Sequence, residues 1–422
     1  MSERNKRVMV LGMGQTGQAV FAFLQKEGAA VEAFDDALYG REDRFCTSYD
    51  YAVISPGVPL THPAVCKLKE SGVPVLSEID LAYINCPSQH VFAVSGTNGK
   101  TTTCTILHKL LSSVGRSFLV GNVGTPWIDR IGIIGKKDTV VLEISSFQIE
   151  QSQFFRPEIA ALTNVGEDHL DRHLTKERYQ NVKLSLLEKS KIKVVNSGDP
   201  LQRGVSDAIS YSVTDPVADF YLSGRTIYHN GKKYLLPSPS LGAGYDADYL
   251  CAFAVASTYC GIKKSFLSLY DKVKTPPFRC QYIGKLCGAD VYNDSKGTNV
   301  DATVFAAGRL AANTALILGG SDKGEDYGRL FAGIKENVQR IYLCGANAKD
   351  ILLAAPDAER GKCRMMSTLD DCVRDFTLAP LQVLLFSPAS ASFDYYQNYE
   401  ERGMIFNEIV AKYKNLFEPA AK

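Results

Sequence analysis

The chain has 422 residues, of which 45% are hydrophobic and 22% charged, with a formal net charge of +1. This balance lacks the positive field of a nucleic-acid-binding or membrane-surface protein, and no apolar run is long enough to span a bilayer. Eleven scattered cysteines and a polar N-terminus without a signal peptide predict a cytoplasmic protein with reduced thiols. A chain of this length is expected to form two or three domains.

The first pattern is a glycine-rich turn between two short apolar segments. Residues 8–11 predict a strand, residues 12–17 read Gly-Met-Gly-Gln-Thr-Gly, and a helix follows to about Gly28. A second strand at 30–34 ends in Asp35 and Asp36, and another at 52–54 ends before Ser55 and Gly57. This arrangement is typical of dinucleotide or nucleotide-sugar binding. A tight turn that needs glycine only for close packing is the alternative interpretation.

The second pattern begins the next segment, after Pro87. An apolar strand at 90–95 leads into Gly96-Thr97-Asn98-Gly99-Lys100-Thr101, and a helix begins at about Thr102. Backbone N–H groups at such a loop and helix start face phosphates, the lysine neutralises them, and the threonine hydroxyl binds Mg²⁺. The longer Walker pattern wants another glycine where Val94 stands. An ordinary strand–helix turn with a solvated lysine is the alternative.

Further strands at 117–120, 139–144 and 159–165, with helices between them, predict a parallel sheet. Its carboxyl edge would carry Glu143 and His169 together with Lys100, because ligands collect at that edge. Thr101 and Glu143 offer Mg²⁺ a hydroxyl and a carboxylate oxygen, and His169 could reach a second ion. Asp168 and His169 could instead cap a helix. Zinc is disfavoured because no third soft ligand accompanies the nearby histidines.

Residues 275–277 read Thr-Pro-Pro, which ends any helix and marks a second boundary. Strands then alternate with helices again, and small-residue loops at 293–298 and 387–394 could receive anions. We therefore expect an α/β protein with domains at 1–88, 89–275 and 276–422. A helix at 177–189 carries Lys183, and a nearly all-apolar helix is expected at 245–259.

Five segments in this order resemble the Mur ligase family over essentially the whole chain: 96–102, 142–148, 164–172, 293–298 and 387–394. The resemblance implies a Rossmann-like N-terminal domain, a central P-loop ATPase-type domain with a mostly parallel sheet, and a Rossmann-like C-terminal domain. It also implies an ATP-dependent amide ligase that works through an acyl phosphate in peptidoglycan precursor synthesis. Asn98, the N-terminal glycine turn and the pattern at 387–403 favour the branch that adds D-glutamate to UDP-N-acetylmuramoyl-L-alanine.

The resemblance also implies roles for single residues. Two Mg²⁺ ions are expected, the first on Thr101 and Glu143, the second on His169 with Lys183, which matches a position that is carbamylated in the family. Lys100, His169 and Lys183 would thus be catalytic, although a plain surface lysine is the alternative for Lys183. The expected ATP-binding residues are Gly96, Thr97, Asn98, Gly99, Lys100, Thr101, Thr102, Arg279, Asp294 and Lys296.

The acceptor and the amino acid would bind in the outer domains. The residues expected to contact the UDP-linked acceptor are Gly14, Gln15, Thr16, Asp35, Asp36, Ser55, Gly57 and Asn122. Those expected to hold D-glutamate are Thr298, Lys323, Ser392 and Tyr399. Phe278 stands where the family has histidine, and residues 244–249 replace its His-Asn-x-x-Asn, so no adenine contact is assigned. We expect small-molecule partners only, and a monomer.

Three other functions stay open. A folylpolyglutamate synthase-like ligase would not need the nucleotide-sugar domain at the N-terminus. A nicotinamide oxidoreductase would use the first glycine turn but leave the phosphate loop idle. A nucleotide-binding protein without catalysis is compatible with the altered histidine and asparagines.

Overall fold

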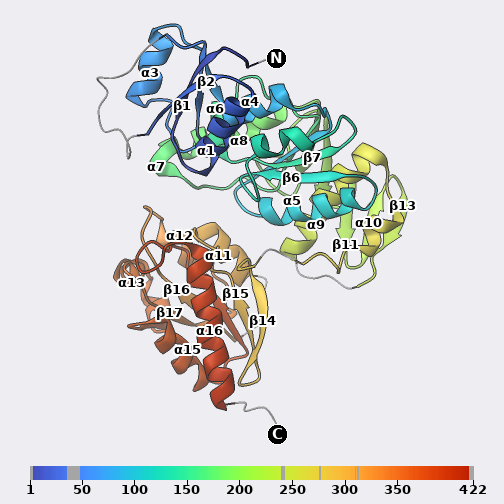
Figure 1. The fold of residues 1–422 in the computed structure, drawn as a ribbon. Helices are drawn as coiled ribbons and strands as arrows, with labels where there is room; N and C mark the ends of the chain where they lie inside the picture. Colours follow the sequence, from blue (N-terminus) through green and yellow to red (C-terminus); the bar gives the residue numbers. More distant parts are fainter. Residues whose placement is uncertain are drawn as a thin grey trace. The chain divides into compact units, whose positions relative to one another are not determined.

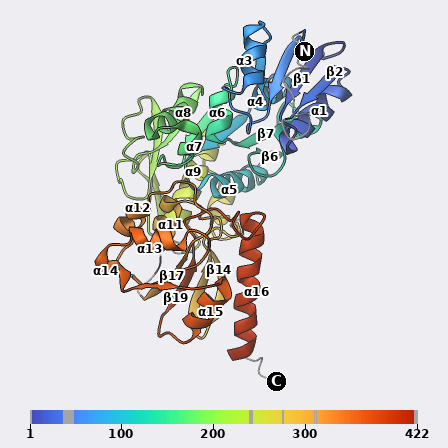
Figure 2. The ribbon, with the colours of Figure 1, turned by 90° about the vertical axis from the view of Figure 1, so that its left-hand side faces the viewer.

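The computed structural model describes residues 3–35, 48–238, 243–274, 277–308, 310 and 313–417. These residues form two compact units, which are described separately. The first contains the described residues up to 165 and most of those from 177 to 273, and the second contains 166–176 and those from 274 onward. Figures 1 and 2 show the elements of both units.

The N-terminal part of the first unit is a four-stranded parallel sheet in the order β2-β1-β3-β4. Its strands are largely apolar and buried, as expected for a parallel sheet covered on both faces. The strands are β1 (Arg7–Leu11), β2 (Ala30–Phe34), β3 (Tyr51–Ile54) and β4 (Val75–Ser77). The helices are α1 (Gln15–Lys26), α3 (Pro63–Glu70) and α4 (Glu78–Asn85).

A nine-stranded sheet in the order β13-β12-β11-β10-β9-β8-β5-β7-β6 follows, parallel from β6 to β11 and antiparallel beyond. The parallel strands are β5 (Val91–Ser95), β6 (Ser117–Gly121), β7 (Thr139–Glu143), β8 (Ile159–Leu162), β9 (Ile192–Asn196), β10 (Ala208–Ser212) and β11 (Phe220–Ser223). Two more complete it: β12 (Thr226–His229) and β13 (Lys232–Leu235). The helical elements are α5 (Lys100–Ser112), η2 (Trp127–Ile133), α6 (Ser146–Gln151), α8 (Lys176–Glu188), α9 (Ala243–Cys260) and α10 (Lys264–Ser268). Much of α9 is completely buried, which confirms the expected apolar helix.

The second unit contains a six-stranded sheet in the order β14-β15-β19-β16-β17-β18, parallel except for the β14–β15 pair. Its strands are β14 (Gln281–Leu286), β15 (Ala289–Asn293), β16 (Thr314–Leu318), β17 (Val338–Leu343), β18 (Cys363–Met365) and β19 (Val383–Phe386). Its helices are α7 (Leu170–His173), α11 (Val300–Ala307), α12 (Tyr327–Gly333), α13 (Ala348–Ala354), α14 (Asp357–Arg360), α15 (Leu369–Thr377) and α16 (Tyr399–Phe417). The red helix α16 runs beside β14 (Figure 1). The expected α/β fold with parallel-rich sheets is confirmed.

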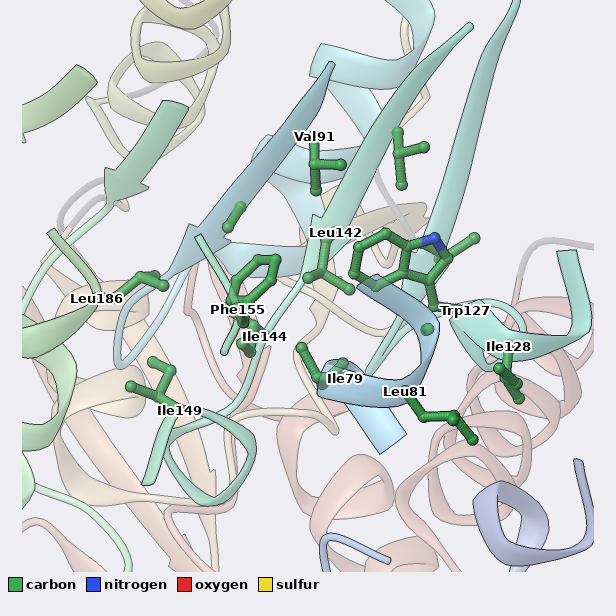
Figure 3. Close-up of a cluster of buried hydrophobic side chains, with 14 of the residues drawn as sticks. Ile79, Leu81, Val91, Trp127, Ile128, Leu142, Ile144, Ile149, Phe155 and Leu186 are labelled. Atoms are coloured by element: carbon green, nitrogen blue, oxygen red, sulfur yellow. The ribbon is translucent and has the colours of Figure 1, made fainter. Parts of the chain in front are cut away.

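One hydrophobic core joins the two sheets of the first unit. Ile79 and Leu81 of α4 pack in the same buried cluster as Trp127, Leu142 and Phe155 (Figure 3). The N-terminal sheet and the nine-stranded sheet are therefore held together by burial of apolar surface. Each predicted domain contains one of the three sheets, and the predicted boundaries themselves stay a prediction.

A buried carboxylate reinforces this junction. Asp80 has none of its surface exposed, and its carboxylate accepts backbone N–H groups of Gln153, Phe154 and Phe155 at 2.8–3.1 Å. We expect Asp80→Ala to lower the free energy of unfolding by about 3–5 kcal/mol, because three amides lose their acceptor together. Urea denaturation measures it, with the exposed Asp129→Ala as control. A loss no larger than that of the control would contradict this role.

Candidate functional site

The three glycines of the N-terminal turn have different surroundings. Gly12 has a φ of +84°, which favours glycine. A Cβ on Gly17 would lie 1.8 Å from the carbonyl oxygen of Gly12, so this position permits only glycine where the helix meets the strand. A Cβ on Gly14 would have nothing within 4 Å. The close-packing interpretation therefore holds for Gly17, whereas Gly14 leaves its backbone open to a ligand.

This turn borders a pocket of about 450 Å³ in the first unit. The pocket gathers seven of the eight residues predicted for the UDP-linked acceptor: Gly14, Gln15, Thr16, Asp35, Ser55, Gly57 and Asn122. Asp36 lies outside the described residues. Asp35 also accepts the backbone N–H of Met13 at 2.6 Å, so its carboxylate helps to fix the glycine turn. Pro126 and Gln148 line the same pocket and were not predicted.

The predicted phosphate loop connects β5 to α5. Gly96 and Gly99 have φ values of +147° and +82°, and a Cβ on Gly96 would lie 1.9 Å from the hydroxyl oxygen of Thr163. The backbone amides of Thr97 and Asn98 donate to Asn164 at 2.9 Å each. These two amides therefore hold the loop against the end of β8. The sequence pattern predicts that all the loop amides face phosphates, and these two do not. The first turn of α5, starting at Lys100, still offers its N–H groups to an anion.

Two lysine ammonium groups meet at this loop. Lys100 Nζ donates to the carbonyl oxygens of Gly96 and Thr97, and Lys183 Nζ donates to the same oxygen of Gly96, each at 2.8 Å. Lys183 is only 1% exposed, so the surface-lysine interpretation is wrong. Tyr179 lies beside it, with its ring centroid 4.9 Å from the ammonium. With both lysines unmodified, as here, two neighbouring positive charges make the loop attractive to a polyanion.

Glu143 lies one strand away, paired in register with Val94 of β5. Its side chain is 2% exposed, and Oε1 accepts a hydrogen bond from Asn122 Nδ2 at 2.8 Å. Its other oxygen, Oε2, has no hydrogen-bond partner among the described residues. A buried carboxylate oxygen without a partner needs explanation, and a bound divalent cation supplies one. Across the described part of the chain, no cluster of three or more histidine, cysteine or acidic side chains could hold a metal.

His169 belongs to the second unit, directly before α7, with a φ of +54°. Asp168 accepts the backbone N–H of His169 at 2.9 Å and the side-chain amide of Asn299 at 3.0 Å. Neither of these two contacts reaches an N–H group of α7, so the capping alternative stays open. A metal at His169 stays a prediction.

The pocket around His169 has a volume of about 500 Å³ and also includes the predicted Lys323. Arg329 lines this pocket and donates hydrogen bonds to two other lining residues, Glu167 at 2.7 Å and Asp301 at 3.0 Å. Burial raises the pKa of Glu325, another lining residue, to about 7. The charged run 322–329 was the available sequence signal for these residues, but it resembles an ordinary solvated surface.

The remaining predicted residues of the second unit are those expected to hold the amino acid and those expected to bind ATP. Ser392 is buried next to Ala391 and Phe393, which line the His169 pocket, and Thr298 is half-buried. Asp294 accepts the N–H of Cys280 at 2.8 Å and the hydroxyl of Ser387 at 2.6 Å, so both its oxygens make contacts inside this unit. Lys296 Nζ lies 4.1 Å from the ring centroid of Tyr399. Arg279, which directly precedes Cys280, is half-buried.

The two departures from the family pattern have local consequences. Phe278 is buried against Gly403, where a Cβ would lie 2.4 Å from its ring. Asp248, in the altered segment of α9, contacts the phosphate loop: its Oδ1 would lie 2.2 Å from a Cβ on Gly99. It also accepts a hydrogen bond from Thr103 at 3.4 Å. Asp248 is therefore a loop-contacting residue that the sequence interpretation missed.

Comparisons with known proteins agree with the motifs. Residues 94–244 match the Mur ligase middle domain. The chain is 34% identical to the UDP-N-acetylmuramoylalanine--D-glutamate ligase of Koribacter versatilis, covering 98% of both chains. It is 31% identical to the ligase of the same name from Caldicellulosiruptor bescii, covering 97% of this chain and 98% of that protein.

The fold is similar to the crystal structure of MurF ligase from Thermotoga maritima in complex with ADP, with a TM-score of 0.62 and 19% identity. That match covers 97% of this chain and 96% of the other. The chain belongs to the Mur ligase family, which confirms the resemblance inferred from its motifs. None of its described helices combines the length and apolar character that crossing a bilayer requires.

Proposed function

We propose that this chain ligates D-glutamate to UDP-N-acetylmuramoyl-L-alanine, with conversion of ATP to ADP and phosphate. The observation that carries the proposal is the hydrogen bond between Asn122 and Glu143. Asn122 lines the pocket of the N-terminal glycine turn, and Glu143 ends the strand beside the phosphate loop. An acceptor in that pocket would therefore reach toward a nucleotide at the loop. Two ligases at 31–34% identity over nearly the full length support the same reaction.

The reaction would proceed in two steps. The carboxylate of the acceptor attacks the γ-phosphorus of ATP, ADP leaves, and an acyl phosphate forms. The amine of D-glutamate then attacks the acyl carbon, phosphate leaves, the amine loses a proton, and an amide remains. Lys100 and the first turn of α5 would hold the transferred phosphoryl group by charge and hydrogen bonds.

Mg²⁺ would neutralise phosphate charge when bound, and the donor set fits it. Thr101 and Glu143 would hold the first ion, and His169 with a carbamylated Lys183 the second. Residues 1–88 would bind the UDP part, 89–275 ATP, and 276–422 the amino acid through Thr298, Lys323, Ser392 and Tyr399. The protein would act on these small molecules as a cytoplasmic monomer.

We expect Lys183→Ala to reduce ligation at least about 100-fold, because a buried metal-binding anion would be lost. Formate or acetate should restore part of the activity by occupying the space of the missing carbamate. The exposed Lys191→Ala is the matched control. Full activity in Lys183→Ala would exclude the carbamate, and loss without anion rescue would restrict the lysine to a structural role.

Phosphate release from ATP tests the function directly. The protein is mixed with ATP, Mg²⁺ and UDP-N-acetylmuramoyl-L-alanine, with D-glutamate, with L-glutamate, or with neither. Release that needs both the acceptor and D-glutamate is the expected result. Phosphate release that is the same with and without D-glutamate would overturn the proposal. So would oxidation of NADH without phosphate release.

A further inference from the structure

Gln151 has a buried side-chain amide. It lies on α6, which follows β7 of the nine-stranded sheet, and its amide contacts the loop after β3 of the N-terminal sheet. It ends α6 and is 2% exposed. Its Nε2 lies 2.7 Å from the carbonyl oxygen of Val58, and 3.4 and 3.5 Å from those of Pro56 and Ser55. Three carbonyl oxygens around one nitrogen require a donor there, which fixes the orientation of the amide. Its Oε1 has no hydrogen-bond partner among the described residues.

The loop that Gln151 holds is one wall of the acceptor pocket. Ser55, Pro56, Gly57 and Val58 all line that pocket. The Ser55 hydroxyl donates to the carbonyl oxygen of Gly12 at 2.7 Å, and a Cβ on Gly12 would lie 2.7 Å from Val58 Cγ2. The loop and the glycine turn are therefore packed together, and a displacement of one displaces the other.

The other end of the connection is the strand that ends in Glu143. Between Glu143 and Gln151, Ser145 caps α6, and the side-chain oxygen of Gln148 accepts the backbone N–H of Ser145 at 2.9 Å. This reciprocal capping box stabilises the start of the short helix. Gln148 also lines the acceptor pocket. A short helix with a capping box at its start thus connects the carboxylate beside the phosphate loop to the wall of the acceptor pocket.

We propose that Gln151 is a positioning residue. It holds the loop 55–58, and with it the UDP-binding pocket, in a fixed position relative to Glu143. The inference rests on the proposed function for the identity of the ligand. Gln151 touches no reacting group in this arrangement. Its contribution is to the affinity for the UDP-linked acceptor, because a displaced wall no longer matches the nucleotide.

The chain offers a control two residues away, at the exposed Gln153. Gln153 also donates its side-chain amide to a carbonyl oxygen of the N-terminal sheet, that of Val75, at 3.2 Å. Val75 belongs to β4 and does not line the acceptor pocket. Gln153→Leu and Gln151→Leu each remove one side-chain amide that connects the same two sheets. Only Gln151→Leu releases the pocket wall.

The experiment is calorimetric titration of the wild-type chain and both variants with UDP-N-acetylmuramoyl-L-alanine, and separately with ADP and Mg²⁺. Gln151→Leu should weaken acceptor binding about tenfold, raise the KM for the acceptor to match, and leave ADP binding and kcat within about twofold. Gln153→Leu should leave acceptor binding within about twofold. Gln151→Glu should weaken it more than leucine does, because a carboxylate would face three carbonyl oxygens.

The outcomes separate the inference from the function that it rests on. Wild-type protein that does not bind the acceptor overturns the proposed function. If wild type binds it and Gln151→Leu binds equally well, the positioning role is wrong. The same holds if Gln153→Leu weakens binding as much as Gln151→Leu does, because the effect would then be general loosening of the two sheets. Thermal unfolding of both variants measures how far each substitution loosens the junction, and the melting temperature should fall further for the buried Gln151 than for the exposed Gln153.

Discussion

Replacing Lys100 with alanine is expected to reduce ligation by about 10²–10³-fold or more, while the protein stays folded. In this structure the ammonium of Lys100, at the start of α5, donates hydrogen bonds to two carbonyl oxygens of the phosphate loop. A triphosphate there would attract it across a short distance, and the charge that develops during phosphoryl transfer would lose this stabilisation in the variant. The remaining loop contacts, from Asn164 to the amides of Thr97 and Asn98, do not involve the lysine.

Lys109→Ala is the matched control, because Lys109 is an exposed lysine on the same helix. Steady-state phosphate release measures the loss, and circular dichroism with thermal unfolding measures the fold. Lys100→Ala with activity equal to that of Lys109→Ala would remove the phosphate-loop assignment. Loss of activity together with unfolding would show a structural lysine instead.

The parts of the molecule that the sequence predicted are those whose chemistry is local. A glycine turn after a strand and Gly-Lys-Thr before a helix each depend on neighbouring residues, and their strands bring them to the carboxyl edge of a parallel sheet. Seven predicted acceptor residues consequently lie in one pocket. The same reasoning placed Glu143 beside the loop, because β7 pairs with β5.

The residues that escaped prediction act over long sequence separations. Asp80 binds amides at 153–155, Gln151 binds the loop at 55–58, and Asp248 reaches the start of α5. No local pattern distinguishes these side chains from ordinary polar residues on helices. Lys183 was predicted through the family resemblance, but its burial was not, since that depends on how α8 packs against the phosphate loop. The amides of Thr97 and Asn98 were misassigned because Asn164, which accepts them, comes from another strand end.

The second large effect is expected at Glu143, where activity and stability should change in different directions. In Glu143→Gln the side-chain oxygen can still accept the hydrogen bond from Asn122, but an amide replaces the oxygen that has no partner. The variant also removes a buried charge, whose desolvation destabilises the ligand-free protein. We therefore expect its melting temperature without ligands to equal or exceed that of the wild type.

Activity of Glu143→Gln should fall by about 10²–10³-fold, because a neutral amide is a poor ligand for Mg²⁺. The rise in melting temperature that ATP and Mg²⁺ produce should shrink too, since every tenfold loss of affinity removes about 1.4 kcal/mol of ligand stabilisation. Glu150 of α6 is paired with Arg178 of α8, and Glu150→Gln, which removes this carboxylate, should change neither quantity appreciably. A ligand-free protein destabilised by the Glu143 substitution would mean that the carboxylate has a structural partner, and unchanged activity would mean that the metal binds elsewhere. Kept stability together with lost catalysis is the result expected of a carboxylate that serves a ligand, because burial of its unpaired oxygen costs free energy that a bound cation would compensate.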